Sequence, residues 1–96
     1  IRSRTGHLAD RLAAELASKK VRFNVVAPSL TDTPLAERLL SNDKRRQVSA
    51  DRHPLKRVGE PGDIASAVLY LLSDGASWVT GQRIGVDGGL SRISGI

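Results

Sequence analysis

The chain of 96 residues contains no cysteine and no methionine, and its aromatic residues are one Trp, one Tyr and one Phe. Without cysteine it can form neither a disulfide framework nor a thiolate metal site, an absence compatible with the cytoplasm, where we expect the protein. So few aromatic side chains give no stacking platform for single-stranded nucleic acid. No apolar run approaches the ~20 residues that cross a bilayer, and no signal peptide is evident, so we expect no membrane association.

The missing methionine bears on the length of the protein. Translation starts at methionine, and its removal normally requires a small second residue, which Ile1 is not. We therefore expect the chain to be an internal or C-terminal piece of a longer polypeptide.

The formal net charge is +5 at pH 7. Lysine and arginine are scattered, with local clusters only at Lys19–Lys20 and at Lys44–Arg46. A solvated basic surface is favoured over a nucleic-acid interface, so we expect no nucleic-acid partner. A small basic nucleic-acid-binding domain stays as the less favoured alternative.

Apolar periodicity predicts the first two elements. Leu8, Leu12 and Leu16 repeat every four residues, which predicts an amphipathic helix over 5–17. Alternation over 21–27 predicts a strand that stops at Pro28, because proline cannot donate to a sheet ladder.

The rest of the chain predicts helices and one further strand. Thr33 is expected to cap a short helix over 34–40, Asn42 or Asp43 to open a helix over 42–51, and Pro61 to open a third. Residues 82–87 read as a short strand. The order of helix, strand, helices and strand predicts a parallel strand pair joined by a crossover. Two parallel strands cannot stand alone, so we expect the last part of a larger α/β domain.

Several patterns resemble catalytic or metal sites but lack the required context. Ser3, His7 and Asp10 have the residue types of a triad without a nucleophile elbow, and solvated helix residues are favoured. His53 precedes a proline in a loop and is interpreted as a loop or packing residue. Asp87-Gly88-Gly89 is interpreted as a turn rather than a cation site. No histidine pair at ligand spacing and no glycine-rich phosphate loop is present, so we expect no metal and no catalytic residue here.

The segment from Pro28 to Thr33 is the strongest candidate for a binding site. Ligands of parallel α/β sheets bind beyond the carboxyl ends of strands, where this segment lies. Hydroxyl groups of Thr31 and Thr33 could donate to phosphate or amide oxygens, and the helix that follows could favour an anion. The alternative is a helix cap formed by Thr33 or Asp32, and one residue could serve both purposes.

Nearly the whole chain resembles the C-terminal part of the classical short-chain dehydrogenase/reductase family. The similar stretches are "LAAELASKKVRFNVVAPSLTDTPLA" and "HPLKRVGEPGDIASAVLYLLSDGASWVTGQRIGVDGG". They match the family's R-x-N-x-V-x-P-G strand, its R-x-G-x-P-x-E/D loop and its T-G-Q-x-[ILV]-x-V-D-G-G ending. The resemblance implies that residues 1–96 are the C-terminal fragment of one NAD(P)-binding domain, a Rossmann-type doubly wound parallel sheet.

The resemblance also implies a cofactor site at the same segment. Pro28, Ser29 and Leu30 match residues that line the nicotinamide end of NAD or NADP, with the Leu30 backbone meeting the carboxamide. Thr33 matches a threonine that contacts the pyrophosphate or the carboxamide. The family usually has Gly where this chain has Ser29.

The implied activity is hydride transfer between the nicotinamide and a small alcohol or carbonyl substrate, with a catalytic Tyr-Lys pair upstream. Spacing places that lysine near Arg2, and we assign no catalytic role to Arg2. Residues 34–52 match a variable lid over the substrate, and 5–17 and 82–87 match elements that form homodimers or homotetramers. The fragment alone is expected to be inactive, and the alternative to an enzyme is a non-catalytic oligomerisation module.

Overall fold

The computed structural model describes residues 4–93. The elements are α1 (Arg4–Ala17), β1 (Val25–Pro28), the 3₁₀ helix η1 (Pro34–Leu40), α2 (Asp43–Arg52), α3 (Pro61–Leu72), the 3₁₀ helix η2 (Asp74–Ala76), β2 (Arg83–Val86) and α4 (Leu90–Ile93). The predicted α/β class and element order are confirmed, while η2 and α4 were not predicted. Arg2 and Ser3 lie outside the described residues. No helix of the described part is long and apolar enough to cross a membrane.

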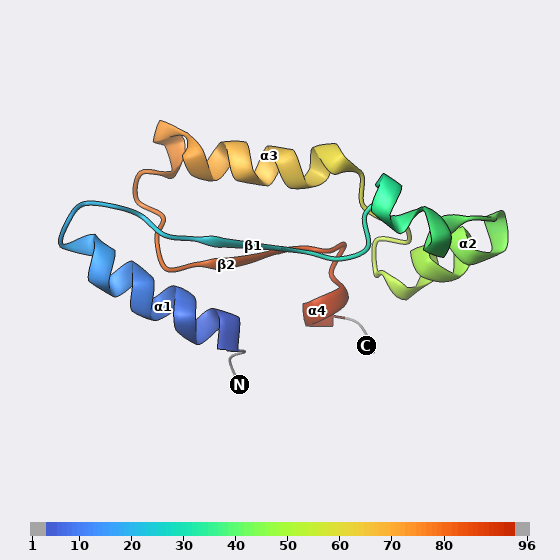
Figure 1. Ribbon diagram of the computed structural model, residues 1–96, viewed down its shortest axis with the longest axis horizontal. Helices are drawn as coiled ribbons and strands as arrows, with labels where there is room; N and C mark the ends of the chain where they lie inside the picture. The colour runs from blue at the N-terminus through green and yellow to red at the C-terminus, as the bar shows by residue number, and fades with distance from the viewer. Residues whose placement is uncertain (1–3, 94–96) are drawn as a thin grey trace.

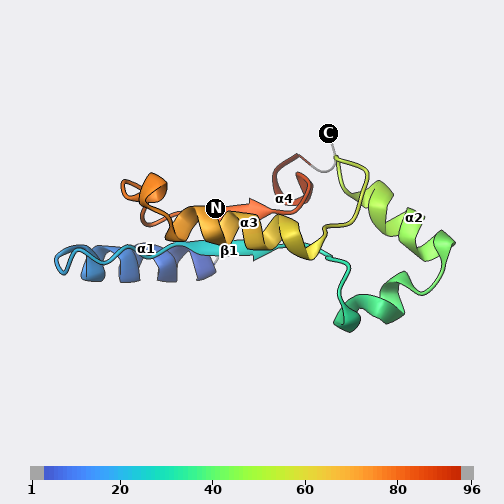
Figure 2. The same ribbon diagram turned by 90° about the horizontal axis from the view of Figure 1, so that it is seen from above.

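The two strands form a parallel pair between helical layers. Their register runs from Val25 opposite Arg83 to Pro28 opposite Val86. Figure 1 shows α3 along one face of the pair and α1 on the other, and Figure 2 shows α3 lying over the strands. Helices on both faces of a parallel sheet are the arrangement of a doubly wound fold.

The first strand begins later, and ends later, than the sequence predicted. Residues 21–24 are outside the ladder, and side chains replace some of its backbone partners there. The Phe23 amide donates to Thr80 Oγ1 at 3.0 Å, and the Gln82 amide donates to Asn24 Oδ1 at 3.0 Å. Pro28 belongs to the strand, because as its last residue it can pair with Val86 without donating a hydrogen bond.

Helix starts follow local side-chain chemistry. Asn42 Oδ1 accepts from the Arg45 amide at 2.8 Å and caps α2, as predicted. The Glu60 amide donates to Asp63 Oδ2 at 2.7 Å at the start of α3. Thr33 occupies the capping position of η1, yet its side chain makes no capping bond. The expectation that Thr33 caps this helix through its hydroxyl is therefore wrong.

The core is thin for a chain of this length. The buried apolar residues are mostly small: Ala9, Ala13, Ala36, Leu40, Val58, Leu71 and Ala76. The Cα radius of gyration is 15.6 Å, against about 13 Å for a compact domain of roughly 100 residues. Both β1 and β2 are only partly buried, which agrees with a sheet that requires further neighbours.

Candidate functional site

A cleft opens where the two parallel strands end. Both strands point their carboxyl ends toward η1 and α2, which stand beyond the sheet (Figure 1). The cleft has a volume of about 410 Å³. It is lined by Ser29, Leu30, His53, Leu55, Arg57, Gly59, Asp63, Gly85, Val86, Asp87, Gly88, Gly89 and Arg92. Ligands of parallel sheets bind at this edge. Two of the five predicted cofactor residues, Ser29 and Leu30, line the cleft; the other three are Pro28, Thr31 and Thr33.

A short parallel bridge closes the chain around the segment that carries η1 and α2. Thr31 pairs with Gly59. The Gly59 amide donates to the Leu30 carbonyl at 3.0 Å, and the Asp32 amide donates to the Gly59 carbonyl at 2.8 Å. Residues 32–58 thus leave the sheet and return at one neck. We call this segment the excursion; it includes the predicted lid at 34–52.

There is little space for a side chain at Gly59 in the neck. A Cβ on Gly59 would lie 3.2 Å from Thr31 Oγ1 and 3.6 Å from the Leu30 carbonyl oxygen. The Thr31 hydroxyl cannot easily move, because it donates to the Ser29 carbonyl at 3.0 Å. The R-x-G pattern of the sequence therefore places its glycine where two chain segments touch.

Ser29 is tied to a buried histidine of the excursion. Ser29 Oγ lies 2.9 Å from His53 Nε2, and His53 Nδ1 lies 2.8 Å from the Ser49 carbonyl oxygen. His53 is 4% exposed. The prediction of a packing residue is confirmed by this burial, but the bond to Ser29 was missed, because nothing in a His-Pro dipeptide reveals a partner far away in the chain.

The two threonines have different surroundings. The Thr31 hydroxyl is engaged by the Ser29 carbonyl, so it is not free to donate to a ligand in this arrangement. Thr33 has no capping bond and is half-buried beside the neck. The helix that follows is a seven-residue 3₁₀ helix opened by a proline, too short and too poor in amide donors for the expected anion preference.

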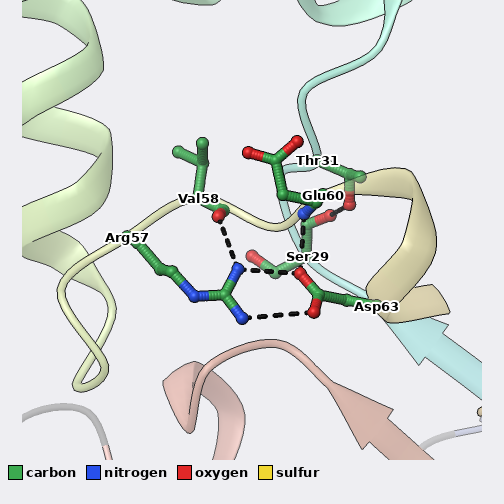
Figure 3. Close-up of polar contacts among 6 residues, drawn as sticks. All are labelled: Ser29, Thr31, Arg57, Val58, Glu60 and Asp63. Atoms are coloured by element: carbon green, nitrogen blue, oxygen red, sulfur yellow. Dashed lines mark hydrogen bonds and ion pairs between the residues drawn. The ribbon is translucent and has the colours of Figure 1, made fainter. Parts of the chain in front are cut away.

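Arg57 and Asp63 form a bidentate pair next to the neck (Figure 3). The Arg57 guanidinium also donates to the Val58 carbonyl at 3.1 Å. Arg57, together with the Glu60 amide, lowers the pKa of Asp63 to about 2. Figure 3 shows Ser29 and Thr31 behind this group, so the pair fixes the chain that faces them.

Two other candidates of the sequence, Asp87 and His7, lie within the described residues. Asp87 accepts from the Ser91 hydroxyl at 2.6 Å and from the Gly89 amide at 3.0 Å, and these bonds lower its pKa. It therefore forms the predicted turn and opens α4. His7 is exposed on α1. Within residues 4–93 no cluster of three or more potential ligands could hold a metal ion.

Comparison with known proteins defines the class. A family model described as enoyl-(acyl carrier protein) reductase matches residues 5–91. The chain belongs to the short-chain dehydrogenase/reductase family, which confirms the resemblance seen in the sequence.

Individual relatives carry names of oxidoreductases. The 3-oxoacyl-(acyl-carrier-protein) reductase FabG of Thermotoga maritima is 47% identical over 81% of this chain and 31% of its own length. The 2-(S)-hydroxypropyl-CoM dehydrogenase 3 of Xanthobacter autotrophicus is 42% identical over 91% of this chain and 36% of its own length. The chain thus spans about a third of these relatives.

Solved structures agree in fold. A short-chain dehydrogenase/reductase from Mycobacterium ulcerans superposes with a TM-score of 0.81 at 41% identity, covering 90% of this chain and 31% of that one. A 4-hydroxyisoleucine dehydrogenase complexed with NADH gives a TM-score of 0.83 at 31% identity, covering 91% and 36%. The Rossmann-type α/β fold expected from the sequence is confirmed.

Proposed function

We propose that the polypeptide containing this chain is a nicotinamide-dependent oxidoreductase that transfers hydride between NAD or NADP and a small alcohol or carbonyl substrate. Residues 1–96 are its C-terminal part, within one dinucleotide-binding domain. Support comes from the family match over 5–91 and from relatives named as reductases and dehydrogenases. The cytoplasm is the compartment we propose.

The observation that carries the proposal is the position of Pro28–Thr33. This segment leaves the carboxyl end of β1 beside the cleft, at the edge where a doubly wound sheet receives its ligand. The residues fit a nicotinamide amide: Leu30 and Ser29 line the cleft, and Thr33 has a hydroxyl that does not cap a helix. When bound, the cofactor supplies the hydride chemistry, and this chain supplies one wall that orients its nicotinamide end.

The excursion is proposed to act as the lid over the substrate. It is closed at the neck by the Thr31–Gly59 bridge and attached to the other strand end, where the Leu55 amide donates to the Gly88 carbonyl at 3.1 Å. A segment that is attached at its base to both strand ends can cover the cleft while its base stays in place. The general acid and base are expected upstream of this chain, so the 96 residues alone are proposed to be inactive.

Assembly into a homodimer or homotetramer is a further part of the proposal. Leu8 on α1 is 56% exposed, and Arg83 on β2 is exposed. These are the elements whose family counterparts form oligomer contacts. Light scattering of the full-length polypeptide measures the assembly, and a monomer at micromolar concentration would reject this part.

Dinucleotide binding by the full-length polypeptide tests the function. We expect NADH or NADPH to bind in isothermal titration calorimetry, and the same preparation to oxidise or reduce members of an alcohol and carbonyl panel. The chain of residues 1–96 is the matched comparison and should show no turnover. A folded full-length polypeptide that binds neither dinucleotide contradicts the proposal and favours the oligomerisation module.

A further inference from the structure

Ser29 lies in the candidate cofactor segment, and its carbonyl and its hydroxyl are both engaged. Its carbonyl accepts from Thr31 Oγ1 at 3.0 Å. Its hydroxyl oxygen lies 2.9 Å from His53 Nε2. Ser29 also lines the cleft. The chemistry that Ser29 offers to a ligand therefore depends on the direction of the bond to His53.

The partner on the other side of the imidazole settles that direction. His53 Nδ1 lies 2.8 Å from the Ser49 carbonyl oxygen, which can only accept a hydrogen bond. Nδ1 must therefore carry the proton, and in the neutral ring Nε2 is an acceptor. The Ser29 hydroxyl then donates its one proton to His53, and Ser29 Oγ has only lone pairs left for a ligand.

The imidazole is also buried and packed against the turn after β2. His53 is 4% exposed, and its backbone amide donates to the Ala50 carbonyl at 3.1 Å. A Cβ on Gly88 would lie 3.4 Å from His53 Cβ and 3.6 Å from His53 Cδ2, so the turn after β2 packs against the ring. Buried and packed in this way, the ring keeps its two nitrogens on Ser49 and Ser29.

We propose that His53 is a positioning residue that makes Ser29 Oγ a hydrogen-bond acceptor for the carboxamide NH₂ of the nicotinamide. A free serine hydroxyl can turn to donate or to accept, but a hydroxyl whose proton is held elsewhere can only accept. Ser29 and His53 together thus recognise the amino group of the carboxamide. A glycine in place of Ser29 has no side chain with which to do so. This inference rests on the proposed function, since it assumes that the nicotinamide end lies at this segment.

Cofactor analogues test the acceptor directly. In the acetylpyridine analogue of the dinucleotide, a methyl ketone replaces the carboxamide and the NH₂ donor is lost. We measure dissociation constants of the reduced dinucleotide and of this analogue for the full-length polypeptide. Ser29→Ala should lower the preference for the natural cofactor roughly fivefold, the value of one neutral hydrogen bond. Ser66→Ala, on exposed α3 surface, is the matched control and should leave the preference unchanged.

The role of His53 is tested by the same ratio of dissociation constants. His53→Phe frees the Ser29 hydroxyl and should lower the preference by a few fold, while His53→Gln restores part of it through an amide oxygen that can accept. In a Ser29→Ala background, His53→Phe should change the ratio no further. His7→Phe, at the only other histidine, is the matched control.

The outcomes separate this inference from the proposed function. If a folded Ser29→Ala variant keeps the wild-type ratio, or if His53→Phe changes the ratio equally with and without Ser29, the inference is overturned while the function stands. If neither NADH nor NADPH binds to the wild type, the proposed function itself fails. If the loss of the buried ring prevents His53→Phe from folding, Ser29→Ala still tests the acceptor oxygen and His53→Gln tests the histidine.

Discussion

Arg57 and Asp63 bind one another through two hydrogen bonds, Nη1 to Oδ2 at 2.7 Å and Nη2 to Oδ1 at 3.2 Å. The same carboxylate accepts from the Glu60 amide at 2.7 Å. One side chain therefore caps α3 and fixes the loop that leads into it from the neck. This loop faces Ser29 and Thr31, so the pair links the stability of the fold to the geometry of the candidate cofactor edge.

The first prediction concerns acid stability. The pKa of Asp63 is about 2 in the folded chain against 3.8 as the ordinary value, because Arg57 and the Glu60 amide stabilise the carboxylate. Above pH 3.8 the stabilisation is fully present, and it is lost as pH falls from about 4 toward 2, because the unfolded state binds the proton first. The urea midpoint of Asp63→Asn should therefore fall less than that of the wild type between neutral and acid pH. This variant has already lost the stabilisation by the carboxylate at neutral pH. Arg57→Gln should flatten the profile in the same way; equal slopes for wild type and both variants would contradict this origin.

The second prediction concerns the neck. Gly59→Ala places a methyl 3.2 Å from Thr31 Oγ1 and should lower the free energy of unfolding by about 1 kcal/mol or more. Gly62→Ala is the matched control, since nothing lies within 4 Å of its Cβ and it is in the first turn of α3. It should stabilise by about 0.5 kcal/mol through lower chain entropy of the unfolded state. Thermal melts of the full-length variants give the sign of both stability changes. A Gly59→Ala variant with unchanged stability would show that the neck can open.

The third prediction separates the two threonines. Thr31→Val removes the 3.0 Å bond to the Ser29 carbonyl and should cost about 1 kcal/mol of stability. Thr33→Val removes no capping bond, so stability should stay within about 0.5 kcal/mol. If Thr33 contacts the cofactor as proposed, its variant should bind the dinucleotide roughly five- to tenfold more weakly. Calorimetric titration checks this, and unchanged affinity would remove Thr33 from the cofactor residues.

The fourth prediction concerns how the excursion is attached. Leu40 is 5% exposed and packs in a small cluster with Ala36 and Val58, against which Leu30 lies. Leu40→Ala should destabilise the excursion by about 2–3 kcal/mol. Leu35→Ala, 98% exposed on the same η1, is the control and should change stability by less than about 0.5 kcal/mol. Hydrogen exchange of residues 34–52 should speed up in the first variant only; equal exchange in both would place the attachment elsewhere.

The sequence predicted the elements well where the signals are local. The leucine repeat gave α1, Asn42 capped α2 and Pro61 opened α3, because periodicity, caps and proline act within one or two turns. The start of β1 was predicted too early, since Asn24 and Thr80 replace ladder bonds with side-chain bonds. Alternation of apolar residues cannot reveal such a replacement.

Of the candidate site, the sequence determined the place: a strand that ends at Pro28 and carries Ser29 to Thr33 to the carboxyl edge of a parallel sheet. Only the tertiary structure decided how these side chains are used. It engaged Thr31 inside the turn, left Thr33 without a capping bond, and joined Ser29 to His53, 24 residues later in the chain. The physical reason is that a hydroxyl group can bond to any acceptor within about 3 Å, so its role depends on which distant segment folds beside it.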